Sequence, residues 1–234
     1  PYGFFWFTLE APLPSGAAFD ELEAPTIGGT WPRVLQSPSA ELLRAIERTL
    51  VRARWYRGHG RRMQSVQITA NVPVGARTTF LVVTVTFGNG ETDAYQLPLT
   101  FVDEADVFDE RSVLAHLESG AIVDTTTSVE GVEDLVSLMR SKGRSRARMP
   151  RLDVATNSTF RRLVGTDPAV TISRKEQSNS NAVVGGAILK VIRHVDDGES
   201  PEVEIGELLR AAKKRFPHQA ELLASDDLER SVRP

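Results

Sequence analysis

The chain has 234 residues, of which 41% are hydrophobic and 25% charged, a composition that excludes wholesale disorder and a length that fits one large or two small domains. The net charge of −3 argues against nucleic acid as the main partner, because a general polyanion binder would be basic. The absence of cysteine excludes disulfides, thiolate metal sites and cysteine nucleophiles. No apolar run approaches the roughly 20 residues needed to cross a bilayer, so we expect no membrane partner.

The N-terminal region combines an apolar segment with a long irregular one. Residues 1–10 place apolar side chains on both faces of a strand, which must then be buried on both faces. This strand either docks on the chain's own sheet or ends a preceding domain, and we favour the second interpretation, with residues 1–12 as its extent. Residues 13–36 are rich in proline and glycine, which predicts a linker from which Trp31 could dock. Because the first residue is Pro1 and not Met, we expect a piece of a longer protein.

A helix and an antiparallel meander are expected next. Ser37-Pro38 is a hydroxyl cap followed by proline, which predicts a helix over residues 39–55. Residues 64–102 are rich in Val, Ile and Thr and contain a Gly-Asn-Gly turn, which predicts a meander across which this helix packs. Two more helices are expected, at about 109–118 and 130–141. We therefore predict an α+β fold that begins with an antiparallel-sheet cap subdomain over residues 37–150.

The last third of the chain has a different order of elements. The pattern predicts strand, polar turn, strand, strand and helix, at residues 170–174, 176–180, 182–184, 187–194 and 201–216. The helix begins at Ser200-Pro201, which repeats the cap-plus-proline signature, and its apolar stripe includes Ile205 and Leu208. Residues 151–234 are therefore expected to form a second unit, whose antiparallel sheet is separate from that of the cap.

One lysine interrupts an aliphatic strand of this second unit. Lys190 shares its strand face with Ile188 and Ile192. A buried ammonium group is costly unless an opposite charge meets it, and Glu204 in the first turn of the next helix is the nearest acidic candidate. A strand lysine paired with a glutamate of the next helix is the arrangement with which protein kinases hold nucleotide phosphates. The alternative is a lysine that extends into solvent from an edge strand.

A polar turn precedes this lysine in the chain. Gln177, Ser178, Asn179 and Ser180 offer hydroxyl, amide and backbone N–H groups, which can cap phosphates without glycine. Taken alone, such a turn is more often only a hairpin. Taken with the lysine and the glutamate described above, it predicts a nucleotide-binding lobe.

These motifs resemble one family of kinases. The segments Glu176–Ser180, Ile188–Arg193 and Ser200–Ile205 resemble the N-terminal lobe of maltokinases, and Arg54–Arg61 resembles the signature of their N-terminal cap. The end of the meander, Tyr95–Leu99, resembles a strand of the same cap. The resemblance covers about residues 37–223.

Within the cap signature, three residues are read individually. His59 departs from the family, which has Lys or Arg at this position. We interpret Trp55 and Tyr56 as hydrophobic anchors of the helix on the sheet.

The resemblance implies an activity and its ligands. Maltokinases are aminoglycoside-phosphotransferase-like kinases of the cytoplasm that make maltose 1-phosphate from maltose and ATP with Mg²⁺. It implies a protein-kinase-like N-lobe in which six residues contact ATP: Gln177, Ser178, Asn179, Ser180, Lys190 and Glu204. Residues 1–10 resemble the final strand of trehalose synthase, which many bacteria fuse to a maltokinase, so a trehalose synthase domain is an expected partner in the same polypeptide.

The catalytic residues of such a kinase lie in a C-terminal lobe, as does most of the maltose site. We therefore expect no catalytic and no metal-binding residue in this chain and no phosphorylation of sugar by the chain alone. Two alternatives stay open at the level of sequence. One is a related sugar kinase, such as a glucosamine kinase, and the other is a non-catalytic cap or assembly module.

Overall fold

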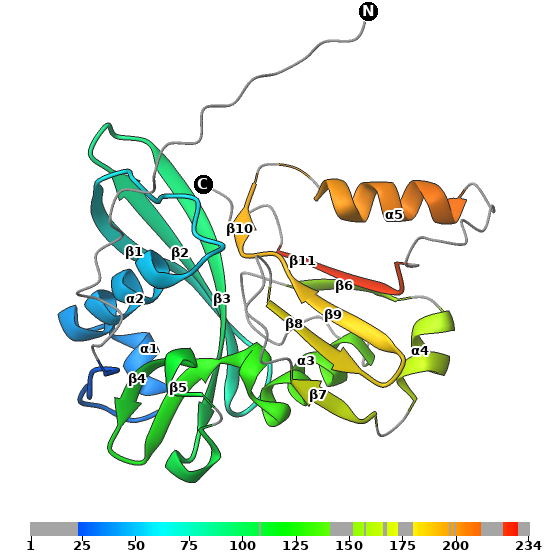
Figure 1. Cartoon of the computed structure of the whole chain (residues 1–234), viewed down its shortest axis with the longest axis horizontal. Coiled ribbons are helices and arrows are strands. Elements are labelled where there is room, and N and C mark those ends of the chain that lie inside the picture. Colours follow the sequence, from blue (N-terminus) through cyan, green and yellow to red (C-terminus); the bar gives the residue numbers. More distant parts are fainter. Residues whose placement is uncertain are drawn as a thin grey trace, which may run out of the picture.

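The computed structural model of the chain describes residues 23–107, 109–140, 152–156, 158–165, 168–172, 180–196, 198, 200–211 and 222–228. The predicted strand at residues 1–10 lies outside them. The largest element is an antiparallel sheet formed by β1 (Met63–Pro73), β2 (Thr78–Phe87), β3 (Thr92–Val102), β4 (Val113–Leu117), β5 (Gly120–Asp124) and β10 (His194–Val195). Its strands stand in the order β1-β2-β3-β5-β4, and β10 pairs with the free part of β3 (Figure 1). Within the described residues, no helix is long and apolar enough to span a membrane.

The meander β1-β2-β3 confirms the prediction for residues 64–102. The expected Gly-Asn-Gly turn joins β2 to β3, where the backbone N–H of Phe87 donates to the carbonyl of Glu91 at 2.9 Å and Gly90 has a φ of 84°. Strand β2 is buried on both faces because each face of the sheet carries a helix. Its Leu81 and Val83 pack toward α2 (Ala40–Arg52), whereas Phe80 and Val82 pack toward α3 (Val129–Arg140).

Helix α2 is the helix expected at residues 39–55, with one correction at its start. Its N-cap is Ser39, whose side-chain oxygen accepts from the backbone N–H of Leu42 at 3.2 Å. The predicted cap, Ser37, instead ends the short helix α1 (Arg33–Gln36). The sequence offers two serines around Pro38, and only the second directly precedes the first helical residue, Ala40, which is the N-cap position. Leu42, Ile46 and Leu50 are buried against the sheet, as their spacing predicts.

The helix predicted at residues 109–118 is wrong. Two short 3₁₀ turns, η1 (Glu104–Asp106) and η2 (Glu110–Ser112), precede strand β4, which pairs with β5. In the turn between β4 and β5, Gly120 has a φ of 155°. A Cβ at this position would lie 2.2 Å from the carbonyl oxygen of Val102. Pairing on both edges of β4 outweighs the helix propensity of its Leu and Ala residues.

The prediction of a linker at residues 13–36 is also wrong for residues 23–36, the part that the structure describes. Residues 25–27 run along the free edge of β4, with the N–H of Ile27 donating to the carbonyl of His116 at 2.9 Å. Ile27, Val34 and Leu35 are buried in the same core as α2. Trp31 docks, as considered from the sequence: its ring stacks on Phe101 and its Nε1 donates to the carbonyl of Ala76 at 3.1 Å. Proline and glycine here give an irregular but packed segment.

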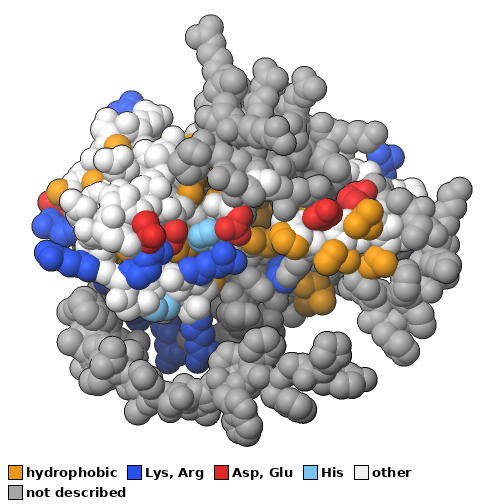
Figure 2. All heavy atoms as spheres, turned by 90° about the horizontal axis from the view of Figure 1, so that it is seen from above, with side chains coloured by type: hydrophobic (Ala, Val, Ile, Leu, Met, Phe, Trp, Pro, Cys, Tyr) orange, Lys and Arg blue, Asp and Glu red, His pale blue; other side chains and the backbone are white. Residues whose placement is uncertain are grey.

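The last third contains two small sheets and two helices. A three-stranded antiparallel sheet consists of β7 (Val170–Ile172), β8 (Ser180–Val184) and β9 (Ala187–Val191), as expected from the sequence. A second sheet pairs β6 (Leu152–Thr156) with β11 (Ala224–Leu228). The helices are α4 (Ser158–Val164) and α5 (Pro201–Ala211). Figure 2 shows hydrophobic side chains at the surface beside acidic ones on the α5 side of the molecule, and Ile205 and Leu208 are 50% and 63% exposed. The predicted inward stripe of this helix is therefore wrong for these two residues.

The boundary expected near residue 150 is crossed in two places. Val132 and Val136 of α3, in the predicted cap, share one apolar core with Phe160 of α4 and with Ala182 and Val184 of β8. In addition, β10 follows β9 directly and adds to the sheet of the cap. The sheets β1–β5 and β7–β9 are separate, but the structure joins the two units through this core and this strand. The kinase-like N-lobe itself stays a prediction.

Candidate functional site

The structure describes only part of the predicted ATP site. Gln177, Ser178 and Asn179 lie outside the described residues, and of Ser180 only the backbone is described, at the start of β8 opposite Val191. Their role in phosphate binding stays a prediction.

Lys190 lies on the exposed face of β9, not on a buried one. It shares that face with Ile188, as predicted, but Ile188 is 71% exposed and Lys190 is exposed as well. The inward face carries Leu189 and Val191 instead. The expectation of a buried lysine is therefore wrong, because an all-aliphatic neighbourhood does not reveal which face of a strand is covered.

Glu204 occupies the first turn of α5, where its backbone N–H donates to the carbonyl of Ser200 at 2.9 Å. Its side chain is exposed. The side chains of Glu204 and Lys190 are both exposed, and within the described part of the chain no ion pair joins them, so they do not form the expected buried pair. Contact of these two residues with a nucleotide stays a prediction.

The cap signature brings several polar and aromatic contacts together. Helix α2 ends at Arg52, and the loop of residues 54–61 folds back over β3. Trp55 and Tyr56 lie against Tyr95 of β3, with ring centroids 6.1 and 5.3 Å away. Tyr56 is buried, which agrees with its interpretation as an anchor.

The end of this loop is held by an arginine. Arg61 donates to Asp93 at 2.7 Å and to Glu91 at 2.8 Å, and its guanidinium carbon lies 3.4 Å from the ring centroid of Phe87. His59, the residue that departs from the family, has a local contact: its Nε2 donates to the carbonyl of Ala53 at 3.0 Å and its ring edge faces Tyr56. The role of His59 within the described residues is therefore to close the loop.

The same loop meets strand β10, from the far end of the sequence. The ring of His194 packs edge-on against Tyr95, with centroids 5.3 Å apart. The Nδ1 of His194 lies 2.8 Å from Asp196, and Arg57 reaches both residues, at 3.3 and 3.5 Å. His194 and Asp196 have the spacing of a His-x-Asp catalytic loop, which the sequence reasoning passed over. Here they sit in and beside a paired strand and hold the Arg57 side chain, so the structure gives them a joining role.

Next to them lies Arg193, the residue that sequence reasoning missed. It is only 2% exposed, and its Nη2 donates to Asp124 at 2.6 Å. Its guanidinium carbon stands 5.3 Å from the ring of Trp55. The one signal in the sequence was an arginine three residues after Lys190 in an apolar strand, which by itself does not distinguish a buried side chain from an exposed one.

The electrostatics of this cluster favour neutral phenols. Burial raises the pKa of Tyr95, and the nearby carboxylate of Asp93 raises it further. Burial and the same carboxylate also raise the pKa of Tyr56. The cluster offers rings and paired charges and holds two parts of the chain together. Among the described residues there is also no group of three or more His, Asp or Glu side chains that could hold a metal ion.

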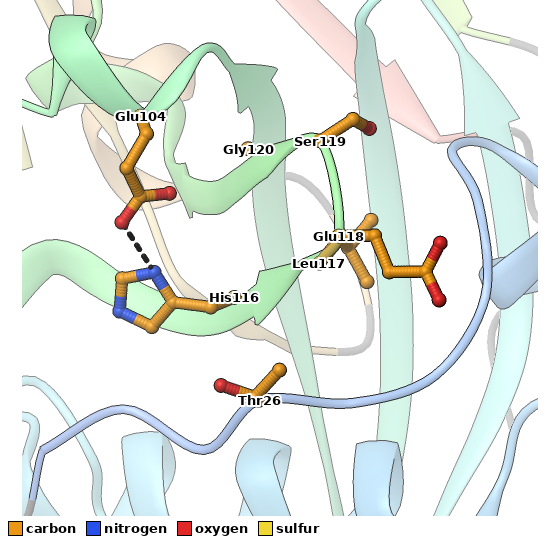
Figure 3. Close-up of a pocket in the computed structure, with 7 residues that line it drawn as sticks. All are labelled: Thr26, Glu104, His116, Leu117, Glu118, Ser119 and Gly120. Carbon is orange, nitrogen blue, oxygen red and sulfur yellow. Dashed lines mark ion pairs between the residues drawn. The ribbon is translucent and has the colours of Figure 1, made fainter.

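A second feature is an open pocket beside β4, lined by Thr26, Glu104, His116, Leu117, Glu118, Ser119 and Gly120. Figure 3 shows Glu104 pointing toward His116, whose Nδ1 lies 2.9 Å from its carboxylate, while Glu118 points away from the ring. The Nε2 of His116 lies 3.6 Å from Glu110. These contacts join the η1 and η2 turns to β4, and nothing in the pocket points to a particular ligand. Sequence reasoning missed it because it placed a helix at residues 109–118.

One comparison with known families locates the cap. Residues 50–134 match the family model of the maltokinase N-terminal cap domain. The match begins near the end of α2, contains the loop of residues 54–61 and all of β1 to β5, and ends within α3. Arg193 and β10 lie outside it. The resemblance of residues 50–134 to the maltokinase N-terminal cap is thereby confirmed.

Proposed function

We propose that this chain is the N-terminal part of an ATP-dependent maltokinase, which phosphorylates maltose to maltose 1-phosphate. The observation that carries the proposal is the match of residues 50–134 to the maltokinase N-terminal cap domain. A match to this cap supports the enzyme family, and the nucleotide and sugar sites are proposed for other parts of the protein. The activity and its substrates are therefore inferred from the family, and the roles of individual residues from their chemistry.

The nucleotide is proposed to bind on the exposed face of β9. Lys190 supplies a positive charge for phosphate oxygens there, and the exposed Ile188 supplies apolar surface that a nucleotide base could cover. Residues 177–180 and Glu204 are proposed to complete the site, and Mg²⁺ would enter together with ATP. This arrangement needs no buried pair in the free chain, because Glu204 can approach when phosphate binds.

The sequence of the first ten residues supports a second part of the proposal. Residues 1–12 would be the last strand of a trehalose synthase domain, which the resemblance of residues 1–10 favours. The product of that domain, maltose, would then be the substrate of the kinase.

The proposal is tested by calorimetric titration of the chain with ATP and Mg²⁺. We expect saturable binding that Lys190→Met weakens by about tenfold or more, since one charge-assisted phosphate contact is lost. The matched control is Arg44→Met, an equally drastic loss of charge on the exposed side of α2. Absence of ATP binding, or equal affinity in the Lys190→Met variant, would contradict the proposed nucleotide site. The acceptor is tested in the polypeptide that carries this chain, where maltose 1-phosphate formation supports the proposal and phosphorylation of glucosamine alone contradicts it.

A further inference from the structure

Arg193 is buried, although Lys190 nearby in the chain is exposed. The two residues are three positions apart, at the end of β9 and just before β10. Lys190 is exposed, whereas Arg193 is almost fully buried. A buried guanidinium is costly unless it is paired, so the contacts of Arg193 must be strong enough to fix its place.

The side chain of Arg193 is held by two parts of the cap. Its Nη2 donates to Oδ2 of Asp124 at 2.6 Å, and its guanidinium lies over Trp55. Asp124 is itself fixed, because its Oδ1 accepts from the backbone N–H of Thr126 at 2.9 Å and from the Thr126 hydroxyl at 2.6 Å. Oδ1 of Asp124 therefore accepts hydrogen bonds within its own turn, and Oδ2 accepts the hydrogen bond of Arg193.

The backbone at this point is held by the cap as well. The N–H of Gln96 in β3 donates to the carbonyl of Arg193 at 2.8 Å, and the side-chain amide of Gln96 donates to the carbonyl of Ile192. The next two residues pair with β3, His194 opposite Tyr95. All the partners named here, Trp55, Gln96 and Asp124, lie within the residues that match the cap family.

We infer that Arg193 is a positioning residue through which the cap fixes strand β9 and, with it, Lys190. Three steps of extended chain span only about 10 Å, so a fixed Arg193 leaves little freedom to the lysine. The consequence for ATP binding rests on the proposed function, but the role of Arg193 in holding β9 on the cap does not. The cap would then be a structural part of the nucleotide lobe, and its loss would displace the lysine that meets the phosphates.

Hydrogen exchange of backbone amides tests the link without any nucleotide. We compare the amides of Ile188–Val191 in β9 with those of Val82–Val85 in the centre of β2. Arg193→Met should speed exchange in β9 by about tenfold, and Asp124→Asn by about 100-fold, because the second change leaves a buried charge without its carboxylate. Adding Arg193→Met to Asp124→Asn should return β9 to the level of Arg193→Met alone. Arg44→Met, on the exposed surface of α2, is the matched control and should change neither strand.

Two results would overturn the inference. One is unchanged exchange in β9 in both single variants, and the other is an equal loss of protection in β2, which would make Arg193 a general core residue. Arg193→Lys, which keeps the charge and loses the planar group over Trp55, serves if Arg193→Met does not fold, and it should speed exchange in β9 to a smaller extent.

ATP titration separates this inference from the proposed function. If the unmodified chain binds no ATP, the proposed nucleotide site is wrong, whereas the exchange experiment still decides the role of Arg193. If the chain binds ATP, Arg193→Lys should weaken binding by about tenfold although Lys190 is intact. Unchanged affinity in that variant would overturn the claim that the cap positions the lysine.

Discussion

The rings of Tyr56 and Tyr95 pack with centroids 5.3 Å apart, one from the loop after α2 and the other from the centre of β3. Both residues are buried, and the hydroxyl of Tyr95 donates to Asp93 at 3.3 Å. The pair joins the cap signature to the sheet, and its stability requires both phenols to stay protonated. Burial, and then the charge of Asp93, raises the pKa of each.

These raised pKa values predict a loss of stability at alkaline pH. In the unfolded chain, both tyrosines ionise near their ordinary value of about 10. Above that pH the unfolded state has lost protons that the native state keeps, so the free energy of unfolding falls as pH rises. Below it, the contribution is fully present. Urea unfolding at pH 8 and pH 10.5 should show this fall, and Tyr56→Phe and Tyr95→Phe should each reduce it. An equal pH dependence in all three proteins would contradict the prediction.

Gly58 in the same loop should tolerate no side chain. A Cβ there would lie 2.3 Å from Cζ and Oη of Tyr56 and 2.8 Å from Phe87. Both rings are packed, so Gly58→Ala should lower the free energy of unfolding by about 1–3 kcal/mol. The control is Gly88→Ala, where the nearest atom would be 3.8 Å away and the effect should stay within about 0.5 kcal/mol. Chemical denaturation measures both, and equal stability of the two variants would contradict this account.

Much of the cap could be predicted from the sequence, because its signals are local. The apolar spacing of α2 and the Gly-Asn-Gly turn between β2 and β3 each specify their own element. Strand β4 could not be predicted in this way, since Leu114 and Ala115 suit a helix and only the pairing with β5 and with residues 25–27 makes the segment extended. The burial of Ile27 could not be predicted for the same reason, because it depends on the edge of β4, which lies far away in the sequence.

The candidate site shows a second limit. Alternation placed Lys190 and Ile188 on one face of a strand correctly, but it does not say which face is covered when both are aliphatic. The sequence is interpreted to make Trp55 a hydrophobic anchor of the helix on the sheet. Its contact with Arg193 joins positions 138 residues apart (193 minus 55), and no pattern within either segment indicates such a pairing.

We predict that Gly131→Ala is destabilising, although helix propensity favours alanine over glycine. Gly131 lies in α3, where alanine would normally be favoured by about 1 kcal/mol. A Cβ there, however, would lie 2.3 Å from the hydroxyl of Thr100, which is within hydrogen-bond distance of Thr78 and Thr125 at 3.1 and 3.0 Å. Gly131→Ala should therefore cost about 1–3 kcal/mol, since a buried chain of hydroxyls must shift. Ser137→Ala on the exposed face of α3 is the control and should be neutral or slightly stabilising; a stabilising Gly131→Ala in thermal unfolding would refute the argument.

Arg57 and Arg61 of the cap signature should differ in their contribution to stability. Arg61 is 31% exposed and contacts Asp93, Glu91 and the face of Phe87, whereas Arg57 is 61% exposed and contacts Asp196 at 3.5 Å. Arg61→Met should cost about 1–3 kcal/mol because it removes short charged contacts around a partly buried Asp93. Arg57→Met should cost no more than about 1 kcal/mol, as is usual for an exposed pair. Methionine keeps an apolar stem at both positions, so the comparison isolates the charged group.

Salt provides the deciding measurement for this pair of variants. At about 0.5 M NaCl the exposed interaction of Arg57 with Asp196 is largely screened, so Arg57→Met and the unmodified chain should have the same stability. Arg61→Met should stay less stable, since the contact of Arg61 with the Phe87 ring and its short bond to Asp93 are less accessible to ions. If both differences vanished in high salt, Arg61 would act only through surface charge, and its placement as the residue that fixes the end of the cap loop would be wrong.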